Sequence, residues 1–265
     1  MTITILTAAR DAAATLPDCL RSVAAQKLPE GLLVHHRVLD GGSTDGSIQL
    51  LESWAAAGLP RSFRSERDGG FYEALNRAIR ETDSEIVGIL NADDFYFDDQ
   101  VLARVAEAFE DRSISGVYGD LVYVDASSSL EDWRVRRYWR AGRYRPSSFR
   151  WGWMPPHPTV FVREAVYESF GGFRLDFGSS ADYEWLLRVM AKGATPFHYL
   201  PRILVAMRQG GMSNRSTAAR LAAHRNDRRA WTVNGMRPLP WTSFLKPLRK
   251  IPQWIARPPV AAEEN

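Results

Sequence analysis

Short apolar runs and helix-like repeats of apolar residues alternate along the first 110 residues of the chain. The apolar or β-branched runs predict buried strands over residues 2–7, 34–39 and 85–90. Apolar residues at helical spacing predict helices over residues 14–25, from 43 or 44 to 57, 71–81 and 98–110. Alternating strands and helices predict an α/β fold with a mainly parallel sheet covered by helices on both faces. Such sheets bind ligands at the carboxyl ends of their strands.

The pattern after residue 110 is mixed. Strand-like runs at residues 116–124 and 159–162 flank a segment rich in arginine and tryptophan, and helical spacing returns over residues 181–192. A last predicted helix, over residues 216–231, precedes a tail rich in proline, tryptophan and basic residues. We therefore expect one domain over residues 1–215, followed by a C-terminal helix and tail over residues 216–265.

Composition is that of a soluble globular protein, since 45% of the 265 residues are hydrophobic and 25% are charged. No apolar run reaches the roughly 18 residues that cross a bilayer, and the N-terminus lacks the pattern of a signal peptide. These features predict a cytoplasmic protein. The single cysteine, Cys19, falls on the apolar side of a predicted helix, so we expect a structural role for its thiol.

The net charge is only +3, but arginines crowd residues 134–150, where they alternate with aromatic side chains. Such a basic segment attracts nucleic acid, anionic lipid or phosphorylated small molecules, and charge alone does not choose among them. No recognised nucleic-acid-binding module accompanies it, so we expect no nucleic-acid partner. The aromatic and arginine side chains are interpreted either as a platform for sugar rings and phosphate or as core packing.

Two adjacent carboxylates, Asp93 and Asp94, follow the predicted strand that ends at Leu90. Mg²⁺ and Mn²⁺ prefer oxygen ligands, and a carboxylate with diphosphate oxygens and waters completes their coordination shell. The alternative is that the two aspartates only form a turn before the next helix, because aspartate favours turns and helix starts.

Asp40 follows another predicted strand and opens a Gly-Gly-Ser-Thr-Asp-Gly turn. The glycines permit close approach of the backbone to a ligand, and the Asp40 carboxylate can accept a hydrogen bond from a nucleobase N–H. Capping of the following helix is the alternative, which fits Asp45 better than Asp40. The turn is neither Gly-x-Gly-x-x-Gly nor a Walker loop, so dinucleotide-dependent oxidoreductases and P-loop enzymes are disfavoured.

The chain resembles the family 2 glycosyltransferases in a series of motifs that occur in the same order: Thr4–Thr7, Ser22–Gln26, Leu39–Gly46, Ser65–Gly70 and Asn91–Asp94. The resemblance continues, toward the subgroup that builds bacterial exopolysaccharides and related glycoconjugates, at His157–Thr159, Gly171–Phe173, Ala181–Glu184 and Gly210–Ser213. It covers about residues 2–215. It implies a GT-A fold with a nucleotide-binding half (residues 1–110) and an acceptor-binding half (residues 111–215).

The resemblance also implies an activity. The expected enzyme transfers a sugar, with inversion, from a UDP-, GDP- or dTDP-linked donor to a hydroxyl of a glycan or lipid-linked acceptor, assisted by Mg²⁺ or Mn²⁺. A catalytically silent sugar-nucleotide or glycan-binding module of the same fold is the alternative. Polysaccharide or glycoconjugate biosynthesis is the expected setting.

Donor residues follow from the resemblance position by position. Asp94 is expected to hold the metal. The residues expected to bind the donor are Asp40 at the base, Thr7, Ala8 and Ala9 lining its pocket, and Asp68, Asn76, Asn91 and Asp93 near the ribose or sugar. Many relatives carry a Pro-x-Tyr-Asn segment where this chain has Ala8–Asp11, so Arg10 is the candidate to stack on the base.

Asp182 is implied to be the base that takes the proton of the acceptor hydroxyl, with Glu184 as the nearby alternative. The alternative for Asp182 is a capping box with Ser179, in which the carboxylate only satisfies N–H groups at the start of a helix. His157, between two prolines, is a candidate contact for phosphate, acceptor or metal, or a simple turn histidine. Arg208 precedes a glycine-containing segment and is expected to act from a lid over the diphosphate.

The tail places aromatic and aliphatic residues beside basic ones at near-helical spacing between Trp241 and Ile255. This composition predicts contact with an anionic membrane, on the inner face of the cell membrane. The alternative is a helix packed on the protein itself, and Pro247 and Pro252 argue against one long regular helix.

Overall fold

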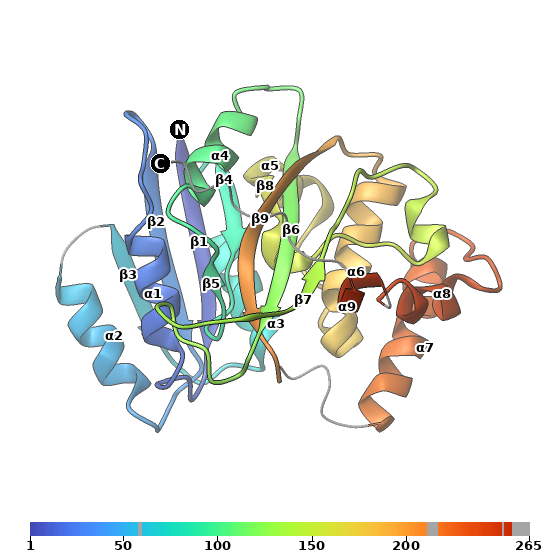
Figure 1. The fold of residues 1–265 in the computed structure, drawn as a ribbon. Helices are drawn as coiled ribbons and strands as arrows, with labels where there is room; N and C mark the ends of the chain where they lie inside the picture. Colours follow the sequence, from blue (N-terminus) through green and yellow to red (C-terminus); the bar gives the residue numbers. More distant parts are fainter. Residues whose placement is uncertain (58–59, 211–216, 251, 256–265) are drawn as a thin grey trace.

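The computed structural model describes residues 1–57, 60–210, 217–250 and 252–255, and Figure 1 shows their arrangement. Four parallel strands form the first part of a central sheet, in the order β3-β2-β1-β4. Their bounds are β1 (Thr2–Ala9), β2 (Leu33–Asp40), β3 (Arg61–Ser65) and β4 (Ile86–Ile89). The prediction of parallel strands joined by helices is confirmed for this part.

Helices cover both faces of the parallel strands. One face packs on α1 (Leu16–Ala24), α2 (Ser47–Ala56) and α4 (Val101–Ala108). The other packs on α3 (Phe71–Arg80), with α5 (Glu164–Phe170) and α6 (Ala181–Leu186) farther along the sheet. All four helices predicted in the first half are confirmed, with ends shifted inward by a few residues, which is the usual uncertainty of helix termini.

The second half of the sheet mixes strand directions. β8 (Phe161–Arg163) runs antiparallel to β4 and to β6 (Gly116–Val124), and β9 (Phe197–Arg208) runs parallel to β6. Two shorter strands complete it: β7 (Val135–Trp139) pairs with β6, and β5 (Phe95–Tyr96) pairs with β9. Since β5 directly follows residues 91–94, its pairing brings the end of β9 against that loop.

Short helices complete the second half. They are η1 (Ser148–Trp151), η2 (His157–Thr159), η3 (Leu175–Ser180) and the π-helical segment η4 (Leu187–Lys192), which continues α6. The helix expected over residues 181–192 is thus present but changes its winding at Leu187. β9 was not predicted, because Pro201 and Arg202 interrupt its apolar pattern.

The C-terminal segment packs against the second half of the domain. It consists of α7 (Thr217–Val233), α8 (Thr242–Leu248) and α9 (Pro252–Ile255). Trp231 of α7 donates its indole N–H to the Tyr183 hydroxyl of α6 at 3.0 Å, and Lys246 of α8 pairs with Asp227 at 2.7 Å. Within the described ranges, no helix has the length and apolar character needed to cross a bilayer.

Close packing of the sheet predicts the cost of adding a single methyl group. A Cβ at Gly88 of β4 would lie 2.5 Å from Cε1 of the buried Phe161, so Gly88→Ala should lower the free energy of unfolding by about 1–3 kcal/mol. Denaturant unfolding measures this change. Gly69→Ala is the control, because its Cβ would meet nothing closer than Glu73 Cγ at 3.8 Å; equal stability of the two variants would contradict the packing described here.

Candidate active site

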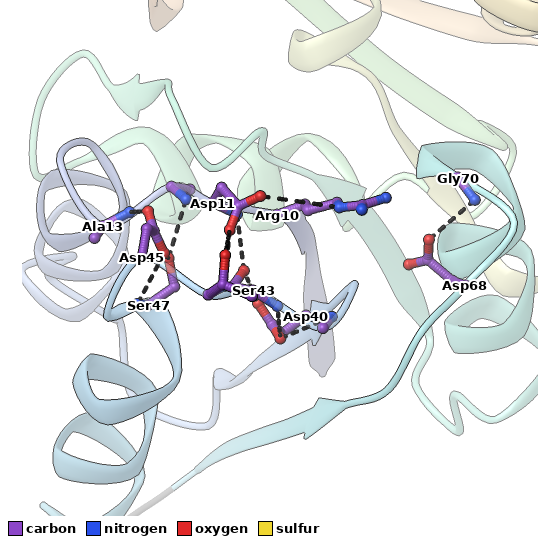
Figure 2. A network of polar contacts seen from close by, with 12 residues as sticks. Arg10, Asp11, Ala13, Asp40, Ser43, Asp45, Ser47, Asp68 and Gly70 are labelled. Carbon is purple, nitrogen blue, oxygen red and sulfur yellow. Dashed lines mark hydrogen bonds and ion pairs between the residues drawn. The ribbon is translucent and has the colours of Figure 1, made fainter.

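The loops after β1 and β2 are held together by a network of side-chain-to-backbone hydrogen bonds (Figure 2). Asp11 donates its backbone N–H to Ser43 Oγ at 2.8 Å, and its carboxylate accepts from the Thr44 N–H at 2.8 Å. Asp45 likewise accepts from the Ala13 N–H at 2.8 Å. The two loops therefore form one surface at the carboxyl ends of neighbouring parallel strands.

Asp40, at the end of β2, holds the backbone of the turn that forms part of this surface. Its buried carboxylate accepts hydrogen bonds from the backbone N–H groups of Gly42 and Ser43, both at 3.0 Å. It also accepts from the hydroxyls of Ser43 and Ser65. Gly42 has φ +77°, a conformation that favours glycine. The structure thus gives Asp40 four internal donors, which fix the turn that follows β2.

Arg10, Arg67 and Asp68 surround the Gly41–Gly42 turn. A Cβ at Gly41 would lie 3.1 Å from Asp68 Oδ2 and 3.5 Å from Arg10 Cδ, and one at Gly42 would lie 3.2 Å from Arg67 Cγ. The Arg10 side chain is 68% exposed. Asp68 accepts the Gly70 N–H at 2.9 Å just before α3, and the N-cap of that helix, Gly70, has no side-chain cap. The turn therefore lies between two arginine side chains and a carboxylate.

The adjacent carboxylates after β4 occupy different environments. Asp94 has no exposed surface, and its two oxygens accept from Asn91 Nδ2 at 2.7 Å and from the Arg208 N–H at 3.2 Å. Burial, and then the charge of Asp93, raise the pKa of Asp94 well above its usual value. Asp93 is half-buried, and burial raises its pKa as well. Among the described residues no side chain donates a hydrogen bond to the Asp93 carboxylate, so its oxygens are the available ones.

Arg208 is buried at the end of β9. Its guanidinium pairs with Asp18 of α1, donates to the carbonyls of Ser128 and Asp93 at 2.8 and 2.7 Å, and lies over the Phe95 ring. The expectation that Arg208 acts from a lid does not fit this placement, because its charge is already satisfied inside the protein. Residues 211–213 of the expected lid lie outside the described residues.

Thr7 is also an internal residue. Its hydroxyl donates to the Leu90 carbonyl at 2.8 Å and lies 3.0 Å from His36 Nε2. Burial, with a contribution from Arg61, lowers the pKa of His36 to about 3. Ala8 is half-buried and Ala9 is buried, and the Ala9 carbonyl accepts the Gly41 N–H at 2.8 Å. Thr7 therefore supports the start of the Asn91–Asp94 loop from within the sheet.

Asp182 lies in the first turn of α6 and is half-buried. Its carboxylate accepts only the N–H of the next residue, Tyr183, at 2.7 Å among the described hydrogen bonds. The expected capping box with Ser179 is not formed, because the N-cap of α6 is Ser180 and that residue makes no side-chain cap. Burial, followed by the charge of Asp182, raises the pKa of Tyr72 of α3.

His157 is buried beside the same carboxylate. Burial lowers the pKa of His157, whereas the charge of Asp182 opposes that shift. Its ring meets the Phe173 ring edge-on with centroids 5.5 Å apart. Asp182, His157 and Tyr72 thus come together from three separate segments of the chain.

Glu184 and Asn76 have internal partners. Glu184 is fully buried, and its carboxylate accepts from Arg188 Nε and Asn234 Nδ2, both at 3.0 Å. The Asn76 amide makes two hydrogen bonds with the backbone of Phe173. Both side chains are therefore engaged by the protein itself.

Sequence reasoning overlooked Tyr72, Arg67 and Phe173. Tyr72 and Asn76 are four residues apart on a predicted helix, so they lie on one face of it. This spacing is the sequence signal that could have identified Tyr72. Phe173 was part of a quoted motif but received no role. The side chain of Arg67 stands out only through its closeness to Gly42.

Comparisons with known proteins show the family of this chain. The family model described as glycosyl transferase family 2 matches residues 4–170, and it confirms the resemblance inferred from the motifs. A PGL/p-HBAD biosynthesis glycosyltransferase of Mycobacterium bovis is 27% identical over an alignment of 216 residues, and the alignment covers 76% of this chain and 75% of the relative.

Two solved structures share the fold. A mannosyltransferase from Pyrobaculum calidifontis, in complex with GDP-Man and Mn²⁺, has a TM-score of 0.63 and 18% identity, covering 92% of this chain and 67% of the other. S. aureus TarS 1-349, in complex with UDP-GlcNAc, has a TM-score of 0.64 and 15% identity, covering 96% and 79%. The GT-A α/β fold expected from the sequence is confirmed.

Proposed function

Since this chain belongs to glycosyl transferase family 2, we propose that it transfers a sugar from a nucleoside diphosphate donor, with inversion, to a hydroxyl of a glycan or lipid-linked acceptor. The observation that carries the proposal is the convergence of three loops at the carboxyl ends of β1, β2 and β4. These loops bring the Gly41–Gly42 turn, Arg10 and Asp93 to one edge of the sheet, where α/β proteins bind ligands.

The donor nucleotide binds, in this proposal, against the surface formed by the loops after β1 and β2. Ala8 and Ala9 form its floor, and Arg10 is exposed enough to stack on the base or meet a phosphate. Asp40 holds the turn rigid through its four donors, so its role is to present the turn to the base. Solved structures of similar fold hold GDP-Man or UDP-GlcNAc, which supports a GDP- or UDP-linked sugar, with dTDP as the third candidate.

The residues present fit a divalent cation held jointly with the donor. Within the described ranges, no three His, Cys, Asp or Glu side chains gather as a metal cage. Mg²⁺ and Mn²⁺ commonly take one or two carboxylates together with substrate phosphates, and the half-buried Asp93 has oxygens free for that purpose. We therefore assign the direct contact to Asp93 and a supporting role to Asp94, whose oxygens are engaged by Asn91 and Arg208. The cation supplies positive charge that stabilises the departing diphosphate.

Asp182 is the proposed base. Its carboxylate takes the proton of the acceptor hydroxyl as that oxygen forms a bond to the anomeric carbon of the donor. The bond from that carbon to the diphosphate oxygen breaks on the opposite face, and its electron pair leaves with the nucleotide. His157 and Tyr72 bound the space around Asp182 and are placed to orient the acceptor.

The different environments of Asp93 and Asp94 predict different defects. Asp93→Asn should abolish the Mn²⁺-dependent binding of the nucleoside diphosphate without lowering the melting temperature. Asp94→Asn should destabilise the protein by about 1–3 kcal/mol, because its amide cannot accept both of the bonds that the carboxylate accepts. Calorimetric binding and denaturant unfolding separate the two effects, and identical behaviour of the two variants would refute the division of roles.

Loss of the base predicts loss of transfer with retained donor binding. Asp182→Asn keeps the oxygen that accepts the Tyr183 N–H, so the fold should persist while transfer from the donor to octyl glycosides falls by about 10²–10⁴-fold. Asp176→Asn, at an exposed carboxylate paired with Arg229, is the matched control and should transfer normally. Near-normal transfer by Asp182→Asn would remove Asp182 from the mechanism.

The C-terminal helices form a surface that we propose contacts an anionic membrane carrying the acceptor. Gly152 lies against the backbone of α8, because a Cβ there would be 2.5 Å from the Lys246 nitrogen. This packing places the exposed Trp151 ring beside that of Trp241, with centroids 6.1 Å apart. Leu248, seven residues after Trp241 on α8, is 54% exposed. Arg150 and Arg249 add positive charge, so the surface has the character of an interfacial membrane contact.

Removing the apolar part of this surface should release the protein from lipid. Trp241→Ser combined with Leu248→Ser should weaken sedimentation with phosphatidylglycerol vesicles by at least about tenfold, since each side chain contributes apolar area to the contact. Leu33→Ser combined with Leu50→Ser changes exposed apolar residues elsewhere and is the control. Unchanged sedimentation of the first variant would exclude this surface as the membrane contact.

A further inference from the structure

Helix α3 lies between two groups of candidate site residues, those around the Gly41–Gly42 turn and those around Asp182. Its N-terminus follows Asp68, which lies beside the Gly41–Gly42 turn. In its first turn, Tyr72 packs against Phe173 of the acceptor half, with ring centroids 5.0 Å apart. The charge of Asp182 contributes to the raised pKa of Tyr72. Four residues later, Asn76 also reaches the acceptor half, at Gly172 and Phe173. A shift of α3 relative to the acceptor half would therefore change the distance between the two groups.

The Asn76 amide holds the backbone of Phe173 in the manner of a strand partner. Its Nδ2 donates to the Phe173 carbonyl at 2.8 Å, and its Oδ1 accepts the Phe173 N–H at 2.7 Å. The preceding residue is a glycine, and a Cβ at Gly172 would lie 2.2 Å from Asn76 Oδ1. The three nearest heavy atoms to such a Cβ all belong to Asn76. Glycine at position 172 therefore leaves the space that the Asn76 amide occupies.

Phe173 connects Asn76 to the side chains near Asp182. Its ring centroid lies 5.0 Å from that of Tyr72, 5.5 Å from that of His157 and 5.6 Å from that of Trp185. The charge of Asp182 contributes to the pKa shifts of both Tyr72 and His157. Because buried aromatic rings are closely packed, a shift of Phe173 displaces its neighbours.

The opposite side of the Gly171–Phe173 turn is fastened to α6 and η4. Trp185 donates its indole N–H to the Gly171 carbonyl at 3.0 Å, and Arg188 donates to the Gly172 carbonyl at 2.8 Å. Arg188 is itself held by the buried Glu184 at 2.9 Å. The turn is therefore bonded to α3 on one side and to the helix that carries Asp182 on the other.

We propose that Asn76 is a positioning residue for the transfer reaction, which sets Asp182 relative to the donor by holding Phe173 to α3, and that it does not bind the donor. The proposal rests on the proposed role of Asp182 as the base. Both polar groups of the Asn76 amide are directed at Phe173, so the amide acts on the reaction through Phe173 and its aromatic neighbours. An error of about 1 Å in the position of a reacting group costs up to about 10²-fold in rate.

The test is a double-mutant cycle between Asn76→Ala and Gly172→Ala. Asn76→Ala should lower kcat for transfer to octyl glycosides by about 10- to 100-fold, with the dissociation constant of the nucleoside diphosphate and Mn²⁺ unchanged within about twofold. Gly172→Ala should show the same defect, because its Cβ displaces the amide. In the double variant the clash is gone, so kcat should equal that of Asn76→Ala alone rather than the product of the two defects.

A matched control removes a similar amide elsewhere. Gln26 donates to the Asp98 carbonyl at 2.6 Å and accepts the Leu102 N–H at 2.9 Å, at the junction of α1 and α4. Gln26→Ala should lower stability without lowering kcat. A kcat loss in Gln26→Ala equal to that in Asn76→Ala would show that any loss of such a clamp reduces activity, and would overturn the proposal.

Two further outcomes contradict the positioning role. Multiplicative defects in the double variant would show that Gly172 and Asn76 act separately, and a weakened nucleotide affinity in Asn76→Ala would return Asn76 to the donor site. Failure of the proposed base is recognised separately, by normal transfer in Asp182→Asn. In that case non-additive unfolding free energies in the Asn76 and Gly172 cycle would still report the contact, while the catalytic role of the contact would be refuted.

Discussion

Arg208 is buried where β9 ends, and its guanidinium group is bonded to three separate segments of the chain. It pairs with Asp18 of α1, donates to Ser128 in the loop after β6, and donates to the Asp93 carbonyl, while its own N–H is accepted by Asp94. Removal of one partner from such a buried set leaves the others without compensation, at a cost of about 3–5 kcal/mol. The antiparallel pairing of β5 with β9 places this cation under the loop after β4. The accessible carboxylate of Asp93 therefore depends on a strand more than a hundred residues away in the sequence.

The candidate site has two parts, one at the loops after β1 and β2 and one around Asp182. The proposed nucleotide side is built from short loops that bond to one another, with Asp40 satisfied by four donors beneath them. The proposed acceptor side is built from aromatic side chains around Asp182, and those side chains pack in the core rather than on loops. Helix α3 begins at the first part. It contacts the second through the hydrogen bonds of Asn76 and the ring of Tyr72, which packs on Phe173. The relative position of the proposed donor site and the proposed base thus rests on the packing of one amphipathic helix.

Much of the fold in the first half could be predicted from the sequence, because its signals are local. β1 is a run of β-branched and apolar residues, and α3 has apolar residues at helical spacing. β9 escaped prediction because Pro201 and Arg202 break its pattern, and its strand state is imposed by pairing with β6. The motifs also indicated the correct family, since several short patterns in a fixed order are specific where one is not.

The roles of individual residues were harder to predict because they depend on distant partners. Asp93 and Asp94 are equivalent in the sequence, and only burial distinguishes the engaged carboxylate from the available one. Arg208 precedes glycine and was interpreted as a lid residue, whereas its partner Asp18 lies 190 positions away. Glu184 was an alternative base until the structure showed it buried with Arg188 and Asn234. Aspartate, glutamate and arginine serve structure and chemistry equally well, so their surroundings decide between the two.

We propose that the edge formed by the loops after β1, β2 and β4 binds a nucleoside diphosphate together with a divalent cation. The decisive quantity is the melting temperature of the purified protein with UDP, GDP or dTDP, each with Mn²⁺ and with EDTA, because a ligand bound to the native state raises that temperature. One nucleotide should raise the melting temperature with Mn²⁺ and lose its effect with EDTA. No shift with any of the three, or a shift of equal size in EDTA, would show that this edge does not bind a nucleotide and a cation together.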